Sequence, residues 1–254
     1  MQSFQNSESR EVLDFDLSVI ITRHGPKQGL DGPLSEKWIK ETQEYFSTEY
    51  ERILINVGRK RRIIASPKVR AIQTAEIYQS ILLTHSDAEP VEVEIEESLN
   101  EGDIMTFYNT LTTEEQKNWF QYWYNGSREL PSNAPVFKRV LRDFSLWLLK
   151  EINTIKTIGG NIDIDAFSHA PLMGAVLLSL EDELCCNIIT DLNNWDRRID
   201  REELFDLYSG KLRALQSMYF HITSDHADIL MLYFLGKKIS IPISLFEKFA
   251  KFVN

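Results

Sequence analysis

The tripeptide Arg23-His24-Gly25 directly follows a short apolar run, and this placement constrains the chain more than any other feature. Residues 17–22 are rich in Val, Ile and Thr, which favour strands, and Gly25 interrupts the pattern. An arginine and a histidine therefore stand at the carboxyl end of a predicted strand, where open α/β sheets bind their ligands. A neutral imidazole can accept a phosphoryl group, and a guanidinium can hold that group through two oxygens.

A second segment, from Ser66 to Ala75, also places a strand before a polar turn. Residues 61–65 predict a strand, and Pro67 fits the first turn of a helix that runs toward Tyr78. Arg70 then lies in the first helical turn, where free backbone N–H groups and the helix dipole favour an anion. We expect Arg70 to contact that anion.

Two later segments supply a carboxylate and a second histidine. Glu101 lies in the sequence Leu-Asn-Glu-Gly, and His169 follows a predicted strand over residues 162–167. Two strand-end histidines, two arginines and one carboxylate are the groups that phosphoryl transfer through a histidine requires. The four segments together indicate a phosphoryl-transfer site.

Taken in order, these segments resemble the histidine phosphatase superfamily, in its phosphoglycerate mutase-like branch. The shared pattern is a strand ending in Arg-His-Gly, then Ser-Pro-x-x-Arg-Ala-x-x-Thr-Ala, then Leu-x-Glu and a late Ser-His, over about residues 15–180. The resemblance implies an α/β fold with a mostly parallel sheet and helices on both faces. It also implies that His24 is the phosphorylated nucleophile and Glu101 the general acid and base, while Arg23, Arg70 and His169 bind the phosphoryl oxygens.

Two departures from this pattern bear on substrate preference more than on the chemistry. Pro26-Lys27-Gln28 follows the first motif, so we expect Gln28 to replace a phosphate-binding Asn of the family. The second histidine is followed by Ala170 in place of the usual Gly, and then by Pro171, which has no N–H to offer a ligand. Gln28 and Ala170 are predicted phosphate contacts on this basis.

The same residues also have plain structural interpretations. A strand-end histidine is often a hydrogen-bonded structural residue, and Arg70 could pair with Glu76. Glu96 and Glu97 lie close to Glu101, and an acidic run is usually a solvated face. The choice of Glu101 as the catalytic acid is therefore the least constrained of these assignments.

Other polar groups carry no motif. The run from Arg59 to Arg62 precedes a strand and is interpreted as a solvated helix end rather than a binding patch. His85, His221 and His226 are expected at the surface. Cys185-Cys186 is an isolated pair, more often buried than metal-binding, and no metal-ligand spacing is present.

Composition excludes several classes of protein. The chain has 254 residues, of which 43% are hydrophobic and 26% charged, so it can bury one large core. A net charge of −10 disfavours nucleic acid as a partner. The first residues lack the apolar stretch of a signal peptide, and no segment is apolar enough to span a membrane. Two cysteines make a disulfide framework implausible. We expect a cytoplasmic protein without a metal ion or cofactor.

We predict a single domain over residues 1–254, with residues 1–14 flexible. Helical spacing over 34–56 predicts a crossover helix, and residues 91–95 alternate as a half-exposed strand. Residues 103–158 predict aromatic-rich helices, and the resemblance implies that they form a helical cap insertion over the site. Residues 217–223 and 228–235 predict a β-hairpin at the sheet edge.

Three functions are compatible with these residues. The leading hypothesis is a metal-independent phosphatase that hydrolyses a phosphomonoester, carried by a small metabolite or a phosphoprotein, through a phosphohistidine on His24. A phosphoglycerate mutase-type phosphotransferase is the second, and a weakly active phosphate-binding or scaffold protein is the third. The sequence indicates neither the substrate nor the oligomeric state.

Overall fold

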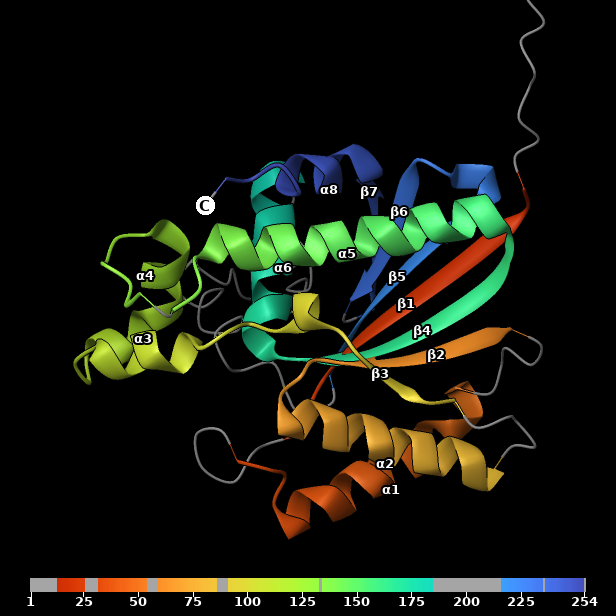
Figure 1. Ribbon diagram of the computed structural model, residues 1–254, viewed down its shortest axis with the longest axis horizontal. Helices are drawn as coiled ribbons and strands as arrows, with labels where there is room; N and C mark the ends of the chain where they lie inside the picture. The colour runs from red at the N-terminus through yellow and green to blue at the C-terminus, as the bar shows by residue number, and fades with distance from the viewer. Residues whose placement is uncertain are drawn as a thin grey trace, which may run out of the picture.

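The computed structural model describes residues 13–25, 32–53, 59–85, 91–132, 134–184, 216–234 and 236–253. These residues form a layered α/β structure in which helices pack on both faces of a seven-stranded sheet (Figure 1). The strand order is β3-β2-β4-β1-β5-β6-β7, so the first strand of the chain lies at the centre. The predicted α/β class, with helices on both faces, is confirmed.

One half of the sheet is parallel. The strand β1 (Phe15–Arg23) pairs with β4 (Gly160–Ser168), β4 pairs with β2 (Lys60–Ala65), and β2 pairs with β3 (Val93–Ile95). The strands predicted at 17–22, 61–65, 91–95 and 162–167 are thereby confirmed. Because parallel strands end at one edge, the residues after β1, β2 and β4 are brought together there.

The other half is antiparallel. β5 (Ser217–Thr223) pairs with β1, and β6 (Ile229–Phe234) joins β5 to the edge strand β7 (Lys237–Pro242). The predicted hairpin corresponds to β5 and β6, which are linked through the short 3₁₀ turn η5 (Ser224–His226). The strand β7 was not predicted, so the antiparallel part of the sheet is larger than the sequence indicated.

Helices close both faces of the sheet (Figure 1). α1 (Glu36–Ile53) and α2 (Val69–His85) lie on one face, and α5 (Phe137–Ile158), α6 (Ala170–Leu184) and α8 (Ile243–Phe249) lie on the other. Side chains alternate across the strands, so each face of the sheet contributes to a separate core. The larger core lies under α5, α6 and α8, and the smaller one packs Phe46, Tyr78 and Phe167 together under α1 and α2.

The segment predicted as a cap divides into two parts. α3 (Ile104–Thr110) and α4 (Trp119–Asn125) lie to one side of the sheet (Figure 1). α5 instead packs against β1, α6 and α8 as part of the helical layer, so the cap predicted over 103–158 is too long. Phe120 and Trp123 of α4 are each 1% exposed and belong to the larger core, which favours a packing role for these aromatics.

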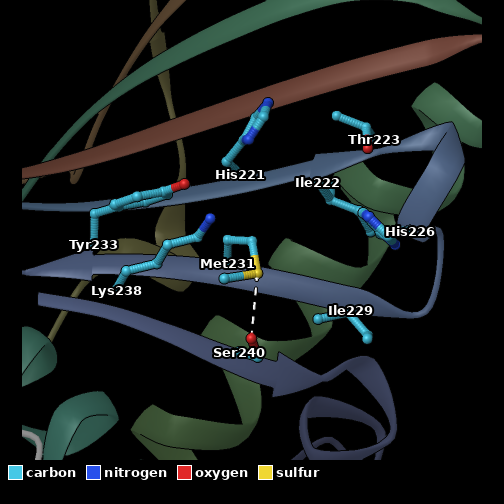
Figure 2. A pocket seen from close by; sticks show the side chains of 9 residues that line it. All are labelled: His221, Ile222, Thr223, His226, Ile229, Met231, Tyr233, Lys238 and Ser240. Atoms are coloured by element: carbon cyan, nitrogen blue, oxygen red, sulfur yellow. Dashed lines mark hydrogen bonds between the residues drawn. The ribbon is translucent and has the colours of Figure 1, made fainter.

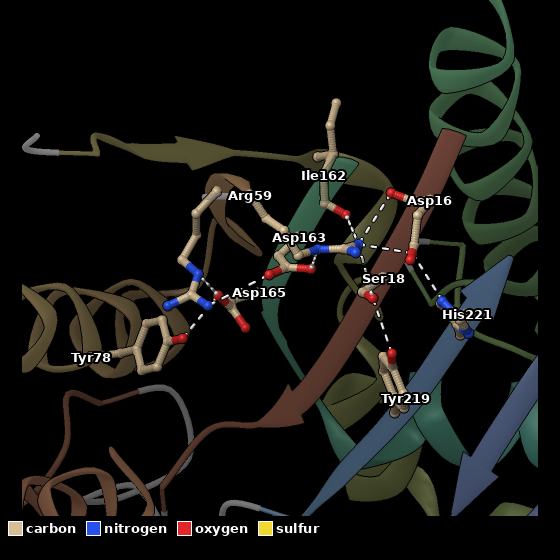
Figure 3. Close-up of polar contacts among 10 residues, drawn as sticks. Asp16, Ser18, Arg59, Tyr78, Ile162, Asp163, Asp165, Tyr219 and His221 are labelled. Carbon is tan, nitrogen blue, oxygen red and sulfur yellow. Dashed lines mark hydrogen bonds and ion pairs between the residues drawn. The ribbon is translucent and has the colours of Figure 1, made fainter. Parts of the chain in front are cut away.

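Arg59, just before β2, and Arg61 within it form partly buried ion pairs, so the prediction of a solvated helix end is wrong for these two residues, whereas Lys60 is exposed (Figure 3). Arg59 donates to Asp163 Oδ1 at 2.6 Å and to Asp16 Oδ1 at 2.9 Å. Arg61 lies 3.6 Å from Asp163 and 3.4 Å from Asp165, and its side chain is 17% exposed. Charged residues at alternate positions of β1, β4 and β2 point to the same face of the sheet. Acidic and basic side chains on neighbouring strands therefore lie next to each other.

His221 extends this network toward the antiparallel strands. Its Nε2 lies 2.9 Å from Asp16 Oδ1 and its side chain is 27% exposed, so it is less accessible than predicted, whereas His226 is exposed. A hollow of about 500 Å³ lies beside it over β5, β6 and β7 (Figure 2). Its lining includes His221, Thr223, Met231, Tyr233, Lys238 and Ser240.

The network gives Asp165 an unusual titration. Burial raises the pKa of this carboxyl to about 6, and nearby Asp163 adds to the effect, although Arg61 and the Tyr78 hydroxyl oppose it. A carboxyl whose folded pKa lies above its usual value of 3.8 favours folding when protonated. That contribution is complete below about pH 4 and is lost as the pH rises through about 6.

Asp165→Asn removes this dependence, because the amide stays neutral at every pH. Between pH 4.5 and pH 7.5, the free energy of unfolding of the variant is expected to rise by about 2 kcal/mol relative to that of the native protein. Urea unfolding at both pH values measures the difference, and any constant cost of the substitution cancels. The exposed Asp225 supplies the matched control, Asp225→Asn. A difference between Asp165→Asn and the native protein that does not change with pH would contradict this prediction.

Several sequence-based expectations fall outside the part of the chain that the structure describes. Gln28, the cysteine pair Cys185-Cys186 and residues 1–12 all lie there, as does the side chain of His85. Within the described ranges, no helix combines the length and apolarity needed to cross a membrane.

Candidate active site

The predicted site residues converge at the carboxyl edge of the parallel strands. Arg23 ends β1 and is in register with Ser168, which ends β4, and His24 N donates to Ser168 O at 3.0 Å. Ser66, directly after β2, donates its N–H to Phe167 O at 2.9 Å. These backbone bonds fix three strand ends relative to one another, so the side chains that follow them meet.

His24 is 6% exposed, and its two ring nitrogens have different partners. Nδ1 lies in short hydrogen-bonding contact with the carbonyl oxygen of Gly25, which can only accept, so Nδ1 carries the proton. Nε2 lies 2.7 Å from Arg70 Nε, which can only donate. The lone pair is therefore on Nε2, the nitrogen that faces the other site residues.

The Arg70 guanidinium contacts His24, Glu101 and His169. Arg70 lies in the first turn of α2 and is 3% exposed. Its second terminal nitrogen, Nη2, lies 3.1 Å from Glu101 Oε1 and 3.3 Å from His169 Nδ1. The alternative pairing of Arg70 with Glu76 is not what the structure shows, since the guanidinium points into the site.

Glu101 is the acid that the fold places in the site. It is 4% exposed, and its Oε2 lies 3.5 Å from His169 Nδ1. Glu97 is exposed, and Glu96 accepts a hydrogen bond from Ser98 N at the start of the 3₁₀ turn η1 (Glu97–Leu99). Of three acids that lie close together in the sequence, the structure thus places the predicted one, Glu101, in the site.

The loop that carries Glu101 is tied down on both sides. The Ser168 hydroxyl donates to Leu99 O at 2.7 Å, which anchors the loop to the end of β4. Gly102 follows at φ +71°, and a Cβ there would lie 2.9 Å from Pro135 Cγ, so this position requires glycine. These restraints hold the Glu101 carboxyl against Arg70.

Arg23 adds a second cation to the site. Burial lowers the pKa of its guanidinium; the Glu101 carboxylate opposes that change, and the charge of Arg70 adds to it. Both interactions place Arg23 within electrostatic reach of the other charged groups. Two guanidiniums around one carboxylate leave a net positive charge, which favours a phosphoryl dianion.

His169 is fully buried and lies edge-on to His24, with the ring centroids 4.8 Å apart. Its Nε2 lies 2.7 Å from the hydroxyl of Ser66, a contact that the sequence analysis did not predict. Ala170 is buried at the first position of α6. A phosphate contact at Ala170 stays a prediction.

The site residues include hydroxyls that sequence reasoning missed. Ser66 and Ser168 are completely buried, and Thr74 Oγ1 donates to Arg70 O at 2.7 Å. All three stand inside or next to the motifs that identified the site, which is the signal that could have found them. Within the described ranges, no group of three His, Cys, Asp or Glu side chains is arranged to hold a metal ion.

Sequence comparisons find no relative, whereas structural comparisons find many. No family model and no curated protein matches the chain. The structure is similar to a phosphoglycerate mutase from Bacillus anthracis, with a TM-score of 0.53 and 12% identity over 95% of this chain and 100% of that chain. It is also similar to a mycobacterial glucosyl-3-phosphoglycerate phosphatase, with a TM-score of 0.50 and 14% identity over 80% and 89% of the two chains.

A third solved structure, described as mycobacterial hydrolase 2, has a TM-score of 0.54 and 13% identity over 92% of this chain and 97% of that chain. At such identities the similarity establishes the fold alone. The chain has a phosphoglycerate mutase-like α/β fold, which is the fold that the resemblance in its motifs implied. Because a mutase and a phosphatase share this fold, the choice between the two activities depends on the site.

Proposed function

We propose that the protein is a phosphatase that hydrolyses a phosphomonoester through a phosphohistidine on His24. The observation that carries this proposal is the orientation of the His24 ring. With its Nδ1 proton engaged by Gly25 O, the Nε2 lone pair faces Arg70, whose guanidinium also contacts Glu101 and His169. A nucleophile, a cation and an acid thus meet around one position.

In the first step, His24 Nε2 attacks phosphorus opposite the leaving oxygen, forming an N–P bond as the O–P bond breaks. Arg23, Arg70 and His169 stabilise the charge on the equatorial oxygens. Glu101 gives its proton to the leaving oxygen, which departs as the alcohol. In the second step, Glu101 takes a proton from the water that attacks phosphorus, and the N–P bond breaks to release inorganic phosphate and regenerate His24.

Substrate binding helps to prepare Glu101 for this role. The Glu101 carboxyl lies 3.1 Å from Arg70 Nη2, an arrangement that favours the charged form. A phosphoryl dianion draws Arg70 toward its own oxygens and places negative charge beside the carboxyl. Both changes favour proton uptake by Glu101 when the substrate is present.

The arginines and His169 supply the positive charge that magnesium supplies in other phosphoryl-transfer sites. We therefore propose that turnover requires no metal ion. The substrate is proposed to be a small phosphorylated metabolite or a phosphoprotein, because the site recognises the phosphoryl group itself. Measuring phosphate release across a panel of phosphorylated metabolites and phosphopeptides, with and without a chelator, tests both statements.

A mutase is the second candidate, because one of the similar structures is a phosphoglycerate mutase. With 3-phosphoglycerate and catalytic 2,3-bisphosphoglycerate, we expect slow release of inorganic phosphate and little 2-phosphoglycerate. A mutase must retain a bisphosphate intermediate, and the residues after His24 and His169 differ from the family pattern. Efficient isomerisation, followed by enzyme-coupled detection of 2-phosphoglycerate, would overturn the phosphatase assignment.

A further inference from the structure

Ser66 occupies a position beside the site that the proposed mechanism leaves without a role. Its side chain is completely buried, and Oγ lies 2.7 Å from His169 Nε2. The position follows from strand register: Ala65 pairs with Phe167, so the residues after β2 and β4 are adjacent. The contact is therefore built into the parallel sheet.

The neighbours of His169 determine which ring nitrogen carries the proton. Arg70 Nη2 lies 3.3 Å from Nδ1, and a guanidinium can only donate, so Nδ1 presents its lone pair to Arg70. The neutral ring then holds its proton on Nε2. A hydroxyl oxygen can accept that proton, which makes Ser66 Oγ the acceptor at 2.7 Å.

We propose that Ser66 is a positioning residue that keeps a proton on His169 Nε2, so that Nδ1 faces the phosphoryl group. This inference rests on the proposed function. When a phosphoryl oxygen enters, the ring can gain a second proton, on Nδ1, and donate a hydrogen bond from Nδ1 to that oxygen. Nε2–H continues to donate to Ser66. The hydroxyl therefore satisfies both ionisation states of the ring, which an apolar neighbour could not do.

The other charged groups around His169 act on its opposite side. Arg70 from α2 and Glu101 from the loop after η1 both face Nδ1, at 3.3 and 3.5 Å. His24, at the end of β1, packs edge-on against the ring. Arg70 favours a lone pair on Nδ1, whereas the Glu101 carboxylate favours a proton there. With Arg70 the closer of the two, the ring proton lies on Nε2, where Ser66 Oγ accepts its hydrogen bond.

Ser66→Ala tests this role directly through the ring nitrogens. In two-dimensional ¹H–¹⁵N spectra of the imidazole groups, the native protein is expected to show a protonated Nε2 on His169. The alanine variant is expected to lose that preference, because Nε2–H would have no acceptor. Ser66→Cys, which keeps a side chain of similar shape with a much weaker acceptor, is expected to shift the tautomer in the same direction.

The matched control is Ser145→Ala. Ser145 is also completely buried and donates to Leu141 O at 2.7 Å, but it lies within α5. For Ser66→Ala we expect kcat/KM to fall roughly 10- to 100-fold, with the pH profile displaced. Ser145→Ala is expected to lose comparable stability in urea, while its pH profile and the His169 spectrum stay unchanged.

The role of Ser66 and the proposed function are contradicted by different results. Ring-nitrogen shifts of His169 that are the same in native protein, Ser66→Ala and Ser66→Cys would overturn the role of Ser66, whatever the activity. The same follows if the Ser66→Ala pH profile matches that of Ser145→Ala. Absence of phosphohistidine in the native protein, in contrast, would overturn the proposed function without affecting the spectroscopic result.

Discussion

His24→Ala is expected to reduce phosphate release on the order of 10⁴- to 10⁶-fold, because the variant lacks the Nε2 lone pair on which the phosphohistidine is proposed to form. In the native protein, brief incubation with a radiolabelled phosphate ester should leave label that is lost in acid and stable in alkali, as expected for a phosphoramidate. The variant should retain no such label. Rapid quench followed by acid and alkali treatment measures both quantities.

His226→Ala is the matched control for this experiment. His226 is exposed on η5, so its loss is expected to leave labelling and turnover unchanged. His169→Ala provides the second comparison, because it removes the ring that faces His24. Label that persists in His24→Ala and disappears in His169→Ala would show that the two histidines have the opposite roles.

Glu101→Gln is expected to slow phosphorylation of His24 by about 10²- to 10⁴-fold with alkyl phosphates, and much less with p-nitrophenyl phosphate. The amide keeps the shape of the side chain but cannot supply a proton. An alkoxide needs that proton as its bond to phosphorus breaks, whereas p-nitrophenolate leaves unaided. Single-turnover measurements by rapid quench isolate this step from the later attack of water.

Glu97→Gln is the matched control, since Glu97 is exposed in the turn that precedes the same loop. It should leave both rates unchanged. If Glu101→Gln slows both substrates equally in the first step, the carboxyl acts by holding Arg70 in place rather than by donating a proton. Asp103, whose carboxylate accepts a hydrogen bond from the Thr106 hydroxyl, would then be the next acid to test.

The arrangement of the site was predictable because it depends on local patterns. Each predicted strand that ends in a polar turn was visible from its apolar residues, and parallel strands bring such turns to one edge. This reasoning placed His24, Arg70 and His169 correctly near one another. The choice of Glu101 over its neighbours came from the resemblance and was the least constrained, because the burial of these acids depends on how the loop after η1 is anchored by Ser168.

The buried charges of the sheet were not predictable in the same way. The arginines at the start of β2 look solvated in sequence, since four basic residues in a row rarely enter a core. Their partners Asp163 and Asp165 lie about one hundred residues further along the chain. Only the pairing of β2 with β4, a long-range feature, brings the opposite charges together.

The same limit explains the helix and strand errors. α5 has the apolar stripe of any amphipathic helix, and nothing in its sequence tells whether that stripe faces a sheet or a cap. β7 is short and carries two lysines and a proline, which weaken a strand pattern. The hydroxyl of Ser66 belonged to a recognised motif, but its partner depended on strand register.

The two outer strands of the sheet bear on how copies of this protein could associate. An open edge can recruit a strand from another molecule, and proteins discourage this with lysines, prolines and very short edges. β7 presents Lys237, Lys238 and Pro242, while at the opposite edge β3 is only three residues long. Both edges of the described sheet therefore oppose the addition of a strand from another molecule.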